Sequence, residues 1–211
     1  MLQLFYSPGA CSMASHIALE EAGAEYTEQP TLIPQGEHRS EAYLKINPRG
    51  RVPALSVEGQ VITENVAILT YVAKRYPQAK LWPADPLTEA RCLSVMAWFS
   101  NTVHPSFAHI VRAERYADDA TAQQSVKDTA RKSFWANLQE IDKMLSGKTW
   151  LMGSQYTVAD PYALVFFAWA TRIELPVKEL PAYSALKTRM MQRPAVRKVL
   201  ESEQSILLKA A

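Results

Sequence analysis

The chain has 211 residues, with 23 basic and 21 acidic side chains and a formal net charge of +2. Its 48% hydrophobic and 21% charged residues are typical of a globular protein and exclude wholesale disorder, and its length allows one large domain or two small ones. The nearly balanced charge predicts neither a nucleic-acid partner nor binding to an anionic membrane.

The first eighty residues alternate between strand and helix patterns. An apolar strand is predicted at 2–6, where it runs into the turn residues that end at Gly9. A helix should follow, with apolar side chains at helical spacing and a stop at Gly23. The next predicted elements are a strand at 26–31, a short helix at 42–46, a hairpin of 52–57 with 60–62, and a helix capped by Thr63. The order βαβαββα predicts an α/β domain.

The rest of the chain carries helix patterns only. Three prolines punctuate the stretch around residues 78–86, which we interpret as a linker between a domain at 1–77 and an all-helical domain at 87–211. The predicted helices lie at 88–102, at 118–145, after the capping residues Thr157 and Asp160, at 183–191 and at 195–208.

Cys11 is the most distinctive candidate for chemistry. It follows a turn and stands where a helix begins, and the free N–H groups of a helix N-terminus favour a reactive thiolate. The competing interpretation is a small buried hydrophobe, which we also assign to Cys92. Because no second cysteine stands three residues away, only a one-thiol redox cycle is open to Cys11.

Three further features are candidates for binding. A cis bond at Val52-Pro53 would free the backbone of Val52 to pair with an extended peptide-like ligand, whereas an ordinary trans proline at a strand start would not. Glu64 and Asn65 open a helix, where free amides bind a carboxylate and an acidic side chain binds an ammonium group. His104 stands at the end or kink of a helix. It could act as an acid, as a base or as a hydrogen-bond donor to a thiolate, and the competing interpretation is a structural residue.

No metal site is predicted, because the four histidines show no ligand spacing. The N-terminal segment lacks the basic and long apolar regions of a signal peptide, and the longest apolar run, 163–170, is too short to span a bilayer. We therefore expect a cytoplasmic protein.

Taken together, the motifs resemble those of bacterial beta-class glutathione S-transferases over essentially the whole chain. The similar segments are 5–17 (FYSPGACSMASHI), 47–55 (NPRGRVPAL, which leads into the family's cis-proline), 63–68 (TENVAI) and 156–160 (YTVAD).

The resemblance implies a thioredoxin-like domain followed by an all-helical domain, in a homodimer that binds glutathione as co-substrate and holds no permanent cofactor. It implies that Val52, at the cis bond to Pro53, pairs with the ligand backbone. Glu64 and Asn65 would hold the γ-glutamyl end. The glutathione sulfur would lie beside Cys11 and His104, and Phe107 and Trp169 would border an apolar pocket for a small hydrophobic electrophile.

The implied reaction is conjugation of the glutathione thiolate to such an electrophile, a detoxification reaction, with peroxidase or disulfide reduction as a side activity. Two alternatives stay open. One is a glutathione-dependent monothiol oxidoreductase that uses Cys11 in a mixed disulfide. The other is a non-catalytic protein that binds apolar ligands.

Overall fold

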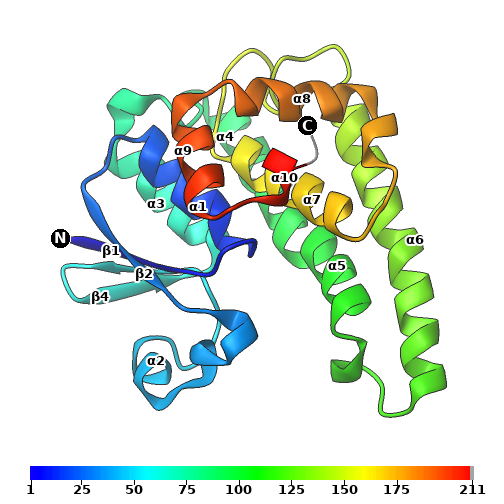
Figure 1. The fold of residues 1–211 in the computed structure, drawn as a ribbon. Coiled ribbons are helices and arrows are strands. Elements are labelled where there is room, and N and C mark those ends of the chain that lie inside the picture. The colour runs from blue at the N-terminus through cyan, green and yellow to red at the C-terminus, as the bar shows by residue number, and fades with distance from the viewer. Residues whose placement is uncertain (210–211) are drawn as a thin grey trace.

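The structure, a computed structural model, describes residues 1–209. An N-terminal α/β unit packs against a larger helical unit, as Figure 1 shows. This is the fold class that the sequence patterns predict.

A four-stranded sheet organises the N-terminal unit. Its strands are β1 (Leu2–Tyr6), β2 (Tyr26–Pro30), β3 (Ala54–Val57) and β4 (Gln60–Thr63), in the spatial order β2-β1-β3-β4. β1 runs parallel to β2 and antiparallel to β3, with Leu4 opposite Leu55 in the register. The predicted βαβ unit and hairpin are therefore confirmed.

Three helices surround this sheet. Figure 1 shows α1 (Ser12–Glu21) and α3 (Asn65–Arg75) on one face of the sheet and α2 (Glu41–Ile46) beyond the other. The predicted cap of α3 is wrong by one residue: Thr63 still pairs in β4, and Glu64 is the cap, with a left-handed backbone at φ 70°. The turn from β4 into α3 is made at Glu64 itself.

The helical unit begins at residue 86. Its helices are α4 (Pro86–Trp98), α5 (His104–Val111), α6 (Ala120–Leu145), α7 (Ala159–Arg172), α8 (Pro181–Met191), α9 (Pro194–Ser202) and α10 (Ile206–Lys209). A π-helical turn, Phe99–Val103, joins α4 to α5. The predicted kink at His104 is that π turn, which rotates the start of α5 relative to α4.

One long helix predicted at 195–208 is wrong. The chain forms α9 and α10 with a break between them, where Gln204 has a left-handed backbone at φ 50°. The break lets Glu203 turn inward, where it is only 4% exposed. Helical periodicity continues across the break, so the pattern alone could not reveal it.

A continuous apolar core joins the two units. α7 lies at its centre, since residues 159–170 are all buried. Hydrogen bonds also cross between the units, among them the paired contacts of Arg193 with Glu21 at 2.6 and 2.7 Å. Over residues 1–209, no helix combines the length and the apolar character needed to cross a membrane.

Candidate functional site

Cys11 lies at the end of the loop between β1 and α1. Gly9 gives this loop a left-handed backbone at φ 71°, a conformation that glycine adopts without strain. Cys11 is the residue that caps α1, as predicted. Its thiol is buried and donates to the Val52 carbonyl oxygen at 3.5 Å. The β1–α1 loop therefore brings Cys11 against the segment before β3.

The expectation of a thiolate at Cys11 is wrong in this structure. Burial raises the pKa of the Cys11 thiol to about 12, although nearby Arg112 and Arg51 act in the opposite direction. Taking a thiolate out of water costs more than the end of one short helix returns. Cys11 is thus a protonated hydrogen-bond donor at neutral pH.

The Val52-Pro53 peptide bond is cis, which the resemblance implies. Within residues 1–209 no acceptor takes the Val52 N–H, whereas its carbonyl accepts the Cys11 thiol. The preceding carbonyl, of Arg51, accepts from the Tyr43 hydroxyl and the Asn47 amide, both at 2.7 Å. These bonds fix the backbone on the N-terminal side of Val52.

The side chains of Glu64 and Asn65 lie in different surroundings, one exposed and the other buried. The Glu64 carboxylate is exposed, and its nearest cation is Arg49 at 4.0 Å. The Asn65 side chain is buried, where it donates to the Cys11 carbonyl at 2.8 Å and accepts from the Ser15 hydroxyl at 2.6 Å. Asn65 therefore couples α3 to the start of α1, and its backbone N–H is the group it presents at the helix N-terminus.

His104 opens α5 and packs edge-on against Trp169, with ring centroids 4.8 Å apart. Burial, helped by the charges of Arg112 and Arg51, lowers the pKa of His104 to about 4. The imidazole is therefore neutral at pH 7, with one nitrogen that donates and one that accepts.

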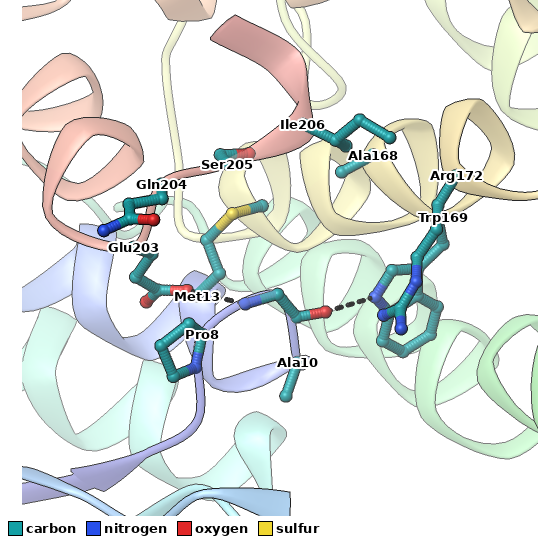
Figure 2. A pocket seen from close by; sticks show the side chains of 11 residues that line it. Pro8, Ala10, Met13, Ala168, Trp169, Arg172, Glu203, Gln204, Ser205 and Ile206 are labelled. Atoms are coloured by element: carbon teal, nitrogen blue, oxygen red, sulfur yellow. Dashed lines mark hydrogen bonds between the residues drawn. The ribbon is translucent and has the colours of Figure 1, made fainter. Parts of the chain in front are cut away.

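Trp169 links His104 to the Cys11 loop. Its indole N–H donates to the Gly9 carbonyl at 3.0 Å, and its ring stacks on Phe107 at 4.3 Å. Figure 2 shows Trp169 at the edge of a cavity of about 280 Å³ between this loop and the C-terminal segment. Trp169 lines the cavity, whereas Phe107 supports Trp169 through the stack.

Sequence reasoning missed a buried carboxylate that holds the same loop. Glu203 accepts from the Gly9 N–H at 3.1 Å and lies 2.9 Å from His16 Nδ1. Burial raises the pKa of Glu203, while His16 opposes the rise. No local pattern could indicate this contact, because 187 residues separate His16 from Glu203.

His16 also belongs to a second group of ionisable side chains, in which its Nε2 atom lies 3.4 Å from the Glu28 carboxylate. His16, Glu20 and Glu28 place one ligand atom each within 4.8 Å of one another. Each carboxylate already has a partner: Lys198 and Tyr26 bind Glu20, and the Tyr6 hydroxyl binds Glu28. We therefore interpret the group as a hydrogen-bonded network.

Two family models match the chain, one over most of each unit. The family model of the glutathione S-transferase N-terminal domain matches residues 1–74, and that of the C-terminal domain matches residues 94–194. The chain is 31% identical to glutathione S-transferase GstA of Escherichia coli O157:H7 over 205 residues, which cover 96% of this chain and 98% of the relative.

Two solved structures of glutathione transferases are similar to the chain over nearly its whole length. A glutathione transferase homologue from Sulfitobacter, with bound glutathione, has a TM-score of 0.91 and 30% identity over 96% of this chain and 98% of its own. A beta-class glutathione S-transferase from Sphingomonas chungbukensis has a TM-score of 0.84 and 34% identity over 95% and 98%. The chain belongs to the glutathione S-transferase family.

Proposed function

We propose that the protein is a beta-class glutathione S-transferase that conjugates glutathione to small hydrophobic electrophiles. The observation that carries the proposal is the meeting of Cys11 with the cis Val52-Pro53 segment, 3.5 Å from sulfur to carbonyl oxygen. The similarity to a beta-class enzyme and to a homologue with bound glutathione supports it.

Glutathione would bind along the N-terminal unit. Its backbone would pair with the Val52 N–H, as an added strand pairs with a sheet edge. Its γ-glutamyl carboxylate would meet the free N–H groups of α3, and its ammonium group would meet the exposed carboxylate of Glu64.

Conjugation needs the thiolate of glutathione rather than that of Cys11. The protonated Cys11 thiol and the neutral His104 imidazole would each donate a hydrogen bond to the glutathione sulfur. Donors placed before the reaction stabilise the thiolate as its proton leaves for solvent. The sulfur electron pair then forms the bond to carbon, and the leaving group departs with its own pair. The raised pKa of Cys11 favours this role over a monothiol disulfide cycle, which needs a Cys11 thiolate.

The proposal extends to the organisation of the protein. Residues 1–77 would bind glutathione, 78–86 would form the linker, and residues 87–211 would line the electrophile pocket at Trp169, with Phe107 behind it. We propose a cytoplasmic homodimer, and sedimentation at micromolar concentration checks the dimer.

Calorimetric titration with glutathione tests the binding site. Glu64→Ala should weaken binding about 10- to 100-fold through loss of a charged hydrogen bond. Glu58→Ala is the matched control, because Glu58 is also exposed and also has a positive φ, 50°, but lies at the hairpin turn. Equal affinities in the two variants would remove Glu64 from the site. Absence of glutathione binding, with no conjugation of 1-chloro-2,4-dinitrobenzene, would refute the proposed function.

A further inference from the structure

Arg49 lies on a tightly held turn between α2 and β3. The buried Asn47 side chain accepts the Arg49 N–H at 3.1 Å, and the Gly50 N–H donates to the Asn47 carbonyl at 2.8 Å. Gly50 has a left-handed backbone at φ 57°, and a Cβ atom there would lie 2.8 Å from the His38 carbonyl oxygen, so a larger residue would displace the turn. The backbone that carries Arg49 is therefore fixed by contacts within the protein.

The Arg49 side chain reaches the junction of β4 with α3. Its guanidinium donates to the Thr63 hydroxyl at 3.0 Å, and Nη1 lies 4.0 Å from the Glu64 carboxylate. In the ion pair of Lys74 with Glu89, by contrast, the charged atoms are 2.6 Å apart. Arg49 and Glu64 are thus neighbours of opposite charge that form no hydrogen bond with each other.

Arg49 and Glu64, which we call the charge pair, both keep capacity to bind a ligand. Within residues 1–209, the bond to Thr63 is the only hydrogen bond of the Arg49 side chain, although a guanidinium carries five N–H donors. In the same part of the chain the Glu64 carboxylate accepts no hydrogen bond, and the two side chains are 67% and 66% exposed. A cation and an anion therefore lie side by side at the N-terminus of α3, and each is open to a ligand.

The charge pair lies at the end of the sheet where the glutathione backbone is proposed to bind. In the β3–β4 register Ala54 stands opposite Thr63, so Val52, two residues before Ala54, is at the same end of the hairpin as Glu64. Neighbouring strands are about 4.8 Å apart, and an extended residue spans about 3.5 Å. A peptide that pairs with Val52 would therefore reach the charge pair with its adjacent residue.

We propose that Arg49, together with the free N–H groups of α3, binds the α-carboxylate of the γ-glutamyl end, so that the charge pair selects thiol peptides with a free α-amino acid end. The inference rests on the proposed function and adds Arg49 to its binding site. An α-amino acid end is a zwitterion whose carboxylate and ammonium group share one carbon, and the charge pair presents the opposite charge to each. A planar guanidinium also matches a carboxylate in geometry.

The probes are three thiol peptides that share a cysteinyl-glycine part. They are glutathione, γ-aminobutyryl-cysteinyl-glycine, which lacks the α-carboxylate, and glutaryl-cysteinyl-glycine, which lacks the ammonium group. Each reacts with 1-chloro-2,4-dinitrobenzene: the thiolate electron pair forms the carbon–sulfur bond, chloride leaves with its bonding pair, and the thiol proton goes to solvent. The carboxylate preference is kcat/KM for glutathione divided by kcat/KM for the aminobutyryl peptide, and the ammonium preference is the same quotient with the glutaryl peptide. Effects on the sulfur and on the glycyl carboxylate cancel in both quotients.

Arg49→Gln should lower the carboxylate preference about tenfold and leave the ammonium preference within about twofold of wild type, because it removes a charged hydrogen bond that only the carboxylate receives. Arg49→Lys should retain part of the carboxylate preference, since the charge remains without the planar fork. Thr63→Val removes the acceptor that holds the guanidinium and should lower the same preference about threefold. Arg91→Gln, at an exposed arginine on α4, should change neither preference. Thermal unfolding midpoints within a few degrees of wild type show that the variants are folded.

Two results would overturn the inference while the proposed function stands. The first is an unchanged carboxylate preference in Arg49→Gln, including the case in which kcat/KM falls equally for all three peptides. The second is a fall of the ammonium preference alone, which would mean that Arg49 acts only by holding Glu64. Failure of the proposed function is distinct, because wild type would then neither bind glutathione in calorimetry nor conjugate any of the peptides, and the inference would fall with it.

Discussion

The half-buried His104 should make the stability of the protein depend on pH in a way that a single substitution removes. Its pKa is about 4 in the folded protein, against 6.5 for an ordinary histidine, because burial disfavours the imidazolium. Between these values the unfolded chain binds a proton that the folded chain does not. The stabilising contribution is therefore complete above pH 6.5, and it is lost progressively as the pH falls through 6.5 toward 4.

The size of the effect follows from the two pKa values. Fully developed, the gap is worth about 3 kcal/mol, and between pH 7 and pH 5 it amounts to about 2 kcal/mol. Wild type should lose that much more stability over this range than His104→Gln, whose side chain does not titrate. Other titrating groups act on both proteins alike and cancel in the comparison.

Urea unfolding of both proteins at pH 7 and pH 5, at one fixed protein concentration, measures the difference. A proton NMR titration of the His104 ring gives its pKa directly and should find the imidazole neutral at pH 5. Equal loss of stability in wild type and His104→Gln, or a ring that titrates near pH 6.5, would refute a neutral imidazole held out of water.

Two more predictions concern Asn65 and the two cysteines. Asn65→Ala should destabilise the protein by about 2–4 kcal/mol in urea unfolding, because it leaves the Cys11 carbonyl and the Ser15 hydroxyl without their partner. Asn101→Ala, a substitution at an exposed site, should cost less than about 0.5 kcal/mol. Cys11 and Cys92 should both alkylate with iodoacetamide at least about a hundredfold more slowly in the native protein than in urea, since burial raises both thiol pKa values to about 12. Mass spectrometry locates the adducts, and rapid native alkylation of Cys11 would contradict the buried thiol.

The elements that short-range patterns encode were predictable. β1 ends where Ser7, Pro8 and Gly9 interrupt an apolar run, and the β3–β4 hairpin turns at Glu58 and Gly59, as the sequence indicates. The helix that begins within the YTVAD segment was also predictable, because Asp160 accepts from the Thr157 N–H at 2.8 Å in a capping arrangement. Each of these signals depends on residues that are close in the chain.

Contacts between distant segments were not predictable from patterns. The Gly9 peptide is held on both sides by the helical unit, through Glu203 on its N–H and Trp169 on its carbonyl. Glu203 lies within a helical pattern in the sequence, and only the break at Gln204 turns it toward Gly9. An acidic residue near a chain end is ordinarily solvated, so no local rule would have assigned it to the site.

Cys11 shows why position in a motif does not fix chemical state. The N-terminus of a helix favours a thiolate, and the sequence reveals that Cys11 stands there. The cost of burying the thiolate depends instead on Val52 and on α7, which lie far away in the chain. Burial prevails for both Cys11 and His104, so each is neutral at pH 7 and is able to donate a hydrogen bond without first giving up or taking a proton. In the proposed reaction the negative charge that develops during conjugation belongs to glutathione, and the protein would meet it with donors that need no change of protonation.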